Sequence, residues 1–384
     1  MSMSFYDALQ LDPAALKARI RASESQREKN FFRLALLSRA LLLVGFAILF
    51  IGAGTSLFGA ENSPMAVVLF CMLLSIRFVN FSYCIRDSLL ALAASLAVLL
   101  LAPGLAARAP AALVAPIHLA AAFSLLFMTA QQPELGNGGL YSFAYIYLVG
   151  NPVFGEAMIR RVLLTLTGCI ICAAVLILKH RSAHSAIRFH HILRNFSLSN
   201  AAHLWQLRMA LAISLILTLG RVLQIERFMW MGFACTSILS AYPYSGRVTP
   251  RFIQRFFGVL TGSAAFFILF QVTPEAFHSL LAPLGGILLG FCTNYLAKTI
   301  MNCFGALSLG AAIYGLQGAV LLRVWDTVLG VLFSLIFAFV FEKLAAIGRA
   351  HKKRQAPRDR AEALPHARPR RKARRSATSQ NFNC

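Results

Sequence analysis

The segment 36–57 reads LLSRALLLVGFAILFIGAGTSL and carries one charged residue, Arg39. An apolar run of about 20 residues is long enough for a helix to cross the hydrocarbon core of a bilayer. The run does not alternate between polar and apolar residues, which is the pattern of a membrane β-strand. It therefore predicts a transmembrane helix, whose backbone groups are satisfied within the segment itself.

Similar apolar segments recur along the whole chain, so we expect a polytopic all-α membrane protein with about twelve transmembrane helices. The composition agrees, because 58% hydrophobic and 13% charged residues leave too little polar surface to solvate a soluble domain of 384 residues. The segments 139–153 and 300–318 are short or contain polar and glycine residues, which is typical of broken or tilted helices. The other segments cover residues 64–80, 88–103, 110–130, 160–178, 205–222, 228–243, 256–273, 278–296 and 323–342.

The basic residues predict the orientation of these helices. Lys and Arg in short loops stay on the cytoplasmic side. With twelve spans and a cytoplasmic N-terminus, most of the 37 basic residues fall inside. Both termini are therefore expected in the cytoplasm. Residues 1–35 have no apolar core, so we expect no cleavable signal peptide.

An internal repeat relates the two halves. The motif RVxxTxxG at 161–168 recurs at 323–330, an offset of 162 residues, and Arg86 and Arg247 lie 161 residues apart. This predicts two parallel six-helix repeats with a solute path between them. Chance matches in low-complexity helices are the alternative. The predicted parts are a cytoplasmic segment (1–35), the first repeat (36–180), a cytoplasmic linker (181–204), the second repeat (205–345) and a disordered basic tail (346–384).

Two stretches carry a resemblance to a known family. Residues 230–243 read WMGFACTSILSAYP, and GRVTPRxxxRxxGxxxG follows at 246–262. Together they resemble the signature of the fusaric acid resistance and aromatic acid exporter superfamily, whose second motif resembles RxxDTxxG at 323–330. The resemblance is strongest over 205–345. It implies a transporter of the bacterial inner membrane that exports aromatic or other organic carboxylates, with kinship to plant malate channels.

The resemblance also bears on partners. Larger family members carry a sizeable cytosolic domain, whereas this chain has only a short linker and a basic tail. The resemblance therefore supports assembly with a periplasmic adaptor less strongly than it supports transport. Assembly as a homo-oligomer is an open alternative. We expect the lipid bilayer as the surroundings, with the basic tail near anionic headgroups. Nucleic-acid binding is the disfavoured alternative for the tail, because no aromatic residues are interleaved with its charges.

Candidate substrate-binding residues follow from the chemistry of a carboxylate. Its path needs fixed positive charge at the mouth, and Arg247, Arg251 and Arg255 share one face at the cytoplasmic end of the ninth predicted span. Arg247, matched by Arg86, is the better candidate. Positive-inside anchoring is the alternative for Arg251 and Arg255.

Deeper in the predicted path, Arg323 and Asp326 lie three residues apart and can pair on one helix face. Arg323 is a substrate-binding candidate, and Asp326 is the candidate for proton coupling, with a purely structural ion pair as the alternative. Asp87 is the other acid near the membrane boundary, and we favour a loop role for it.

Uncharged polar residues in the spans supply further candidates. Asn294 and Tyr314 are assigned to substrate binding, and cross-helix hydrogen bonding is the alternative for each polar residue. Gly258 and Gly262 are spaced for close helix packing, as are Gly286 and Gly290. The other candidates for lining a cavity are Thr293, Tyr295, Asn302, Gln317, Tyr141, Tyr145, Tyr147 and Asn151.

Three functions remain open from the sequence: a secondary-active exporter of organic carboxylates, a passive organic-anion channel, and a non-transporting scaffold or assembly factor. We expect no enzyme activity, cofactor or metal site, because the chain has no P-loop, no HExxH and no GxSxG motif.

Overall fold

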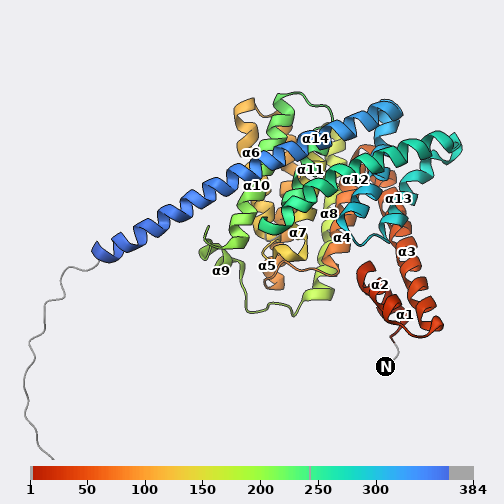
Figure 1. The fold of residues 1–384 in the computed structure, drawn as a ribbon, viewed down its shortest axis with the longest axis horizontal. Helices are drawn as coiled ribbons and strands as arrows, with labels where there is room; N and C mark the ends of the chain where they lie inside the picture. The colour runs from red at the N-terminus through yellow and green to blue at the C-terminus, as the bar shows by residue number, and fades with distance from the viewer. Residues whose placement is uncertain (1–2, 242–243, 363–384) are drawn as a thin grey trace, which may run out of the picture. The chain divides into compact units, whose positions relative to one another are not determined.

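The computed structural model describes the backbone of residues 3–241 and 244–362 and the side chains of 3–241 and 249–347. Within these ranges the chain contains helices and no strand (Figure 1). Seven helices are long and apolar enough to cross a membrane. They are α3 (Gln26–Phe58), α5 (Ile85–Arg108), α6 (Ala111–Thr129), α8 (Gly155–His180), α10 (Ala201–Val222), α12 (Tyr244–Val272) and α14 (Tyr295–Glu362). The prediction of an all-α, multi-pass membrane protein is therefore confirmed.

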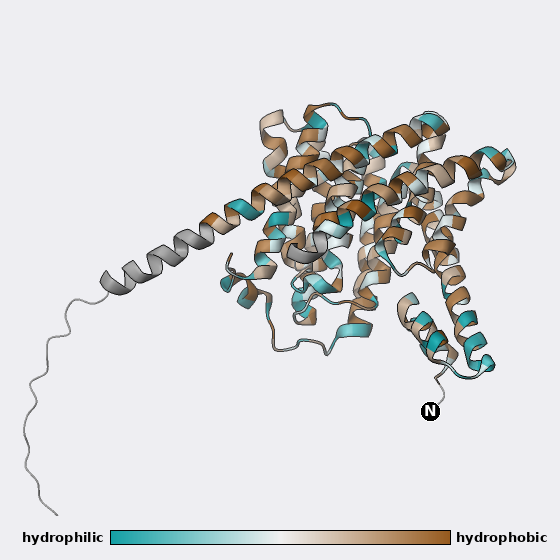
Figure 2. Ribbon diagram, viewed as in Figure 1, coloured by the Kyte–Doolittle hydropathy of each residue, from teal (hydrophilic) through white to brown (hydrophobic). Residues whose placement is uncertain are grey.

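The hydropathy of the residues varies along the helices in a regular way. Figure 2 shows apolar residues along most of the length of the long helices, and hydrophilic residues at the start of α3 and around α9 (Phe189–Arg194). This distribution suits helices whose sides face lipid and whose ends face water.

Four predicted spans form helices that are too short to cross a bilayer. They are α4 (Ser63–Ile76), α7 (Asn137–Val149), α11 (Met229–Leu239) and α13 (Leu281–Leu289). Even the longest, α4, has 14 residues, about 21 Å of helix against a hydrocarbon core of about 30 Å. Two further predicted spans lie within α14, which Gly315 interrupts with a φ of 72°. Twelve full spans are not confirmed, because apolar runs extend through turns that end the helices.

Burial explains why α7 and α11 can be short. Nine of the 11 residues of α11 and nine of the 13 residues of α7 are buried. The two helices contact each other, α7 also packs against α4, α5, α6 and α10, and α11 packs against α10 and α12. A backbone surrounded by protein need not span the lipid. These two helices are therefore the interior of the transmembrane region.

Equivalent helix contacts occur in the two halves. A Cβ on Gly168 of α8 would lie 2.5 Å from the Leu69 side chain of α4, and a Cβ on Gly330 of α14 would clash with the Met231 carbonyl oxygen of α11. Both partners of one contact are offset by 162 residues from those of the other. The contacts agree with the offset of the repeat, and superposition of the halves stays a prediction.

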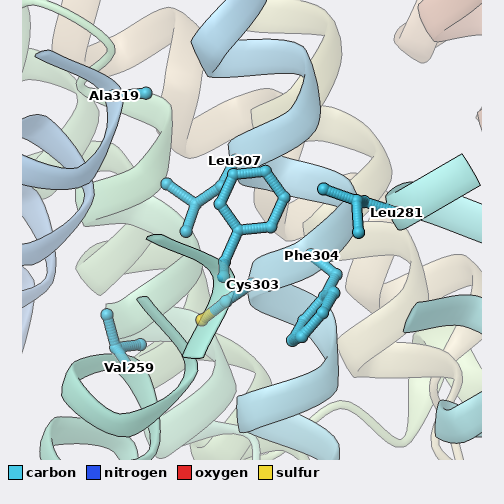
Figure 3. Close-up of a cluster of buried hydrophobic side chains, with 7 residues drawn as sticks. Val259, Leu281, Cys303, Phe304, Leu307 and Ala319 are labelled. Atoms are coloured by element: carbon cyan, nitrogen blue, oxygen red, sulfur yellow. The ribbon is translucent and has the colours of Figure 1, made fainter. Parts of the chain in front are cut away.

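The second half has its own apolar cluster, formed by α12, α13 and α14 (Figure 3). Both predicted glycine motifs lie at such helix contacts: Gly262 approaches Cys303 of α14, and Gly290 approaches Ala40 of α3. The packing role of these motifs is confirmed. The buried members of the cluster are Val259, Phe266, Leu281, Cys303, Phe304, Leu307 and Ala319.

The N-terminal segment is more structured than its polar composition indicates. Helices α1 (Phe5–Gln10) and α2 (Pro13–Ala22) begin at the caps Ser4 and Asp12, and their residues Ala8 and Leu16 are buried against Phe32 of α3. These apolar residues are too few to produce a strong sequence signal. Three short 3₁₀ helices complete the described elements: η1 (Ala60–Asn62), η2 (Pro133–Leu135) and η3 (Glu275–Leu280).

The chain divides into two compact units, Met1–Phe337 and Ala338–Cys384. In the second unit α14 continues to Glu362, so its backbone is helical in part of the segment predicted as a disordered tail. Ala, Arg, Lys and Gln are common there and favour helix. Residues 363–384 lie outside the described residues.

Candidate substrate cavity

A cavity of about 880 Å³ lies within the first unit. It is lined by residues of α7, α11, α12 and α14, with Val67 of α4, and thus by both halves of the chain. One side of α14 contributes Tyr295, Lys298, Asn302 and Leu309. With Ala306, which also lines the cavity, these positions recur every three to four residues over about 21 Å of helix, so they form one stripe.

The charge of the cavity is entirely positive among its described lining residues. Arg251 and Arg255 of α12 and Lys298 and Arg323 of α14 line it, and no Asp or Glu does. Two ion pairs join described side chains, Arg160 with Glu61 and Arg188 with Asp87, and neither involves the four cations. An anionic ligand would supply the missing countercharge.

Arg251 is held in place by the ends of α11 and α14. Its Nη1 donates to the Ser237 carbonyl oxygen at 3.1 Å and to the Ser240 Oγ at 3.3 Å. The Tyr295 ring lies 5.1 Å from the guanidinium carbon, and the Tyr295 hydroxyl donates to the Ser237 Oγ at 2.8 Å. This network orients the guanidinium while leaving other donors available.

Arg255 and Arg323 are buried more deeply. They are 5% and 4% exposed, and the Nε of each is buried without a hydrogen-bond partner. The Arg323 guanidinium carbon lies 5.2 Å from the centre of the Trp230 ring. Because an unpaired buried donor of a charged group costs about 1–3 kcal/mol or more, these two arginines are suited to bind an anion.

Aromatic rings line the wall beside these charges. Phe143 lies 5.5 Å from Tyr147 and 5.0 Å from Phe233, measured between ring centres. All three line the cavity, as does Trp230. Aromatic walls favour a flat apolar ligand, since rings stack edge-to-face or offset at about 4.5–7 Å. The cavity thus combines cationic groups with an aromatic wall.

Residues 211–337 match the family described as fusaric acid resistance protein-like. The match confirms the resemblance for this stretch, which includes Trp230 and all four cavity cations. No curated protein and no solved structure matches the chain. The chain is therefore a multi-pass membrane protein with a fusaric acid resistance protein-like region.

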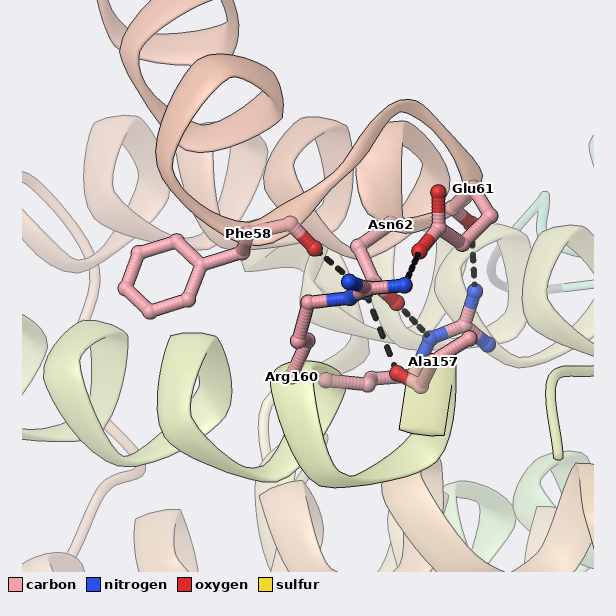
Figure 4. Close-up of polar contacts among 6 residues, drawn as sticks. Phe58, Glu61, Asn62, Ala157 and Arg160 are labelled. Atoms are coloured by element: carbon pink, nitrogen blue, oxygen red, sulfur yellow. Dashed lines mark hydrogen bonds and ion pairs between the residues drawn. The ribbon is translucent and has the colours of Figure 1, made fainter. Parts of the chain in front are cut away.

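The repeated arginine has opposite environments in the two halves. Arg161, outside the fusaric acid resistance-like region, is 2% exposed and donates to the Asn62 Oδ1 at 2.9 Å, the Asn151 carbonyl at 2.9 Å and the Glu61 carbonyl at 3.0 Å. Figure 4 shows the surrounding contacts, in which Asn62 also donates to Phe58 and Ala157. Arg161 is a structural residue, whereas its counterpart Arg323 lines the cavity.

The predicted ion pair between Arg323 and Asp326 is not formed. No ion pair within 4 Å joins them among the described side chains. Asp326 is 1% exposed, and its Oδ2 is buried without a partner. The pair is not formed because the Arg323 guanidinium lies against the Trp230 ring and lines the cavity instead. The role of Asp326 in proton coupling stays a prediction.

Three other predicted site residues, Arg86, Asn294 and Tyr314, lie outside the cavity lining. Arg86 is exposed in the first turn of α5, and Asn294 caps α14 by accepting from the Ala297 amide at 2.7 Å. Tyr314 contacts the Arg227 guanidinium at 5.3 Å. The Arg247 backbone belongs to α12, and its side chain lies outside the described residues.

Asp87 differs from the expected loop residue. It lies in the first turn of α5, and its Oδ2 accepts from the Arg188 Nε at 2.9 Å and from the Phe189 amide at 2.8 Å. These contacts raise the pKa of Arg188, chiefly through the hydrogen bond to the carboxylate. Asp87 therefore attaches the linker to the first half.

Of the remaining polar candidates, Tyr147, Tyr295 and Asn302 line the cavity. Sequence reasoning missed Lys298 and Trp230 as site residues, and it left anchoring open as the alternative for Arg255. The stripe on α14 is a signal that could have found Lys298, which lies between Tyr295 and Asn302 on the same helix face.

Proposed function

We propose that this protein is a secondary transporter of the bacterial inner membrane that exports organic, chiefly aromatic, carboxylates. The observation that carries the proposal is the cavity, in which four cations and an aromatic wall occur with no acidic residue among the described lining. Guanidinium groups bind carboxylates through paired, charge-assisted hydrogen bonds. The aromatic wall accommodates the ring.

The burial of the cations suggests where each part of the substrate binds. Arg255 and Arg323 combine low exposure with unpaired Nε donors, so the carboxylate is assigned to them. The ring is assigned to the wall of Phe143, Tyr147 and Phe233. A volume of about 880 Å³ lies within the usual range of ligand pockets, about 300–1,000 Å³, and accommodates one aromatic acid with water.

The transport path is assigned to the space between two six-helix repeats, with both termini cytoplasmic. Two features support it: the cavity is lined from both halves, and the Gly168 and Gly330 contacts share the offset of 162 residues. The buried, unpaired Oδ2 of Asp326 makes this residue the candidate for the coupled proton.

Transport into everted membrane vesicles tests the proposal, because export appears there as uptake. The probe is radiolabelled 4-hydroxybenzoate, and 4-hydroxybenzamide is its neutral control. We expect uptake of the acid to exceed that of the amide and to collapse with a protonophore. Uptake that follows the concentration gradient regardless of the protonophore would identify a passive channel. Absence of both uptake and binding to the purified protein would refute transport and favour a scaffold.

A further inference from the structure

Arg227, in the connection between α10 and α11, lies against two aromatic rings. Its guanidinium carbon is 5.5 Å from the centre of the Trp230 ring and 5.3 Å from that of Tyr314. Its backbone has a φ of 56°, in the left-handed region that non-glycine residues rarely adopt. Contacts to aromatic faces stabilise the positive charge by about 0.5–2 kcal/mol without occupying its N–H donors.

The donors of Arg227 are correspondingly unused. Its Nε and Nη2 are buried and have no hydrogen-bond partner. Neither of the two ion pairs between described side chains includes this residue. A guanidinium whose Nε and Nη2 are free donors in one plane has the geometry that binds a carboxylate in a bidentate manner.

Trp230 connects Arg227 to the cavity. The indole lines the cavity and contacts the cavity residue Arg323, while Arg227 is not among the lining residues. Two guanidinium groups therefore share one aromatic partner. Tyr314, the second ring at Arg227, directly precedes Gly315, where α14 is interrupted. The contact between Arg227 and Tyr314 is thus next to a break in α14, where the direction of the helix can change.

We propose that Arg227 is a second anion-binding site, which receives the substrate carboxylate from Arg323 past the indole of Trp230. The inference rests on the proposed function and adds an exit site to it, on the side predicted to be periplasmic. An anion that moves between two guanidinium groups remains paired with positive charge, which lowers the cost of crossing an apolar region. The ligand class is the aromatic monocarboxylate bound in the cavity.

The test separates release from binding. Arg227→Met keeps an apolar side chain between the two rings and removes the charge, an exchange that folded proteins often tolerate. The matched control is Arg108→Met, because the Arg108 guanidinium carbon lies 4.1 Å from the Phe154 ring, on the same predicted side and away from the cavity lining. Binding of 4-hydroxybenzoate to the purified full-length variants is measured together with vesicle uptake.

We expect Arg227→Met to lower the maximal rate of uptake about tenfold or more, the effect of losing one charge-assisted interaction. Its dissociation constant for 4-hydroxybenzoate should equal that of wild type, and Arg227→Lys should recover part of the rate. Arg108→Met should transport normally.

Two results would overturn the exit site. One is wild-type uptake by Arg227→Met at equal protein level. The other is loss of binding together with uptake in both Arg227 variants, which would show a structural role. If wild-type protein binds no 4-hydroxybenzoate at all, the proposed function itself fails, so the two failures are distinguishable.

Discussion

Arg161 and Arg323, which open the two RVxxTxxG motifs, should respond oppositely to removal of their charge. Arg161→Met deletes three hydrogen bonds of 2.9–3.0 Å in a residue that is 2% exposed, and it leaves the Asn62 Oδ1 and two carbonyl oxygens without their donor. Each hydrogen bond to a charged group contributes about 1.5–3 kcal/mol, so the loss of three is strongly destabilising. Arg323→Met removes an unpaired Nε and a cation–π contact with Trp230, the contact being worth about 0.5–2 kcal/mol.

The assay is thermal unfolding of the purified protein in detergent, combined with binding of 4-hydroxybenzoate. We expect Arg161→Met to unfold at a clearly lower temperature than wild type while the folded fraction keeps its affinity. Arg323→Met should unfold near the wild-type temperature and bind the carboxylate weakly. Equal destabilisation by the two substitutions, or unchanged binding by Arg323→Met, would refute this assignment of roles.

Four further outcomes are expected. Arg255→Gln should weaken binding of 4-hydroxybenzoate about tenfold or more, with little change for 4-hydroxybenzamide, measured by titration of the purified protein. Asp326→Asn should fold normally, because no ion pair is lost, and should abolish the protonophore sensitivity of vesicle uptake; retained sensitivity would exclude this carboxylate as the proton carrier. Arg247→Gln should slow uptake of the acid more than that of the amide, with partial rescue by Lys, and equal rates would leave Arg247 as a topology anchor. A periplasmic phosphatase fused after residue 345 should be inactive, and activity would contradict a cytoplasmic C-terminus.

Hydropathy predicted the positions of the helices more accurately than their lengths. Apolar composition marks both a helix in lipid and a helix buried in protein, so α11 could not be distinguished from a full span by hydropathy. The 11 residues of α11 end at Leu239, although the apolar run continues toward Pro243. Burial on nearly all sides depends on neighbours such as α7, which are distant in the sequence.

The site was predictable where helical spacing alone places a residue. Arg251 follows from the four-residue spacing on α12, and Tyr295 and Asn302 follow from their polarity within apolar helix. Trp230 belongs to the family signature, but a tryptophan in an apolar segment gives no sequence signal of its contact with Arg323. That contact joins residues 93 positions apart (323 − 230), which a single sequence does not relate.

The proposed repeat accounts for the different fates of the two arginines. Asn62, which accepts from Arg161, corresponds at an offset of 162 residues to Gln224. Gln224 is exposed and donates to the Arg221 carbonyl at 3.1 Å, so it does not take the place of Asn62 as an acceptor for Arg323. Without that partner, the guanidinium lies against Trp230 and lines the cavity. Loss of a structural partner in one copy of a duplicated motif is thus a physical route by which a scaffold arginine becomes available to bind a substrate anion.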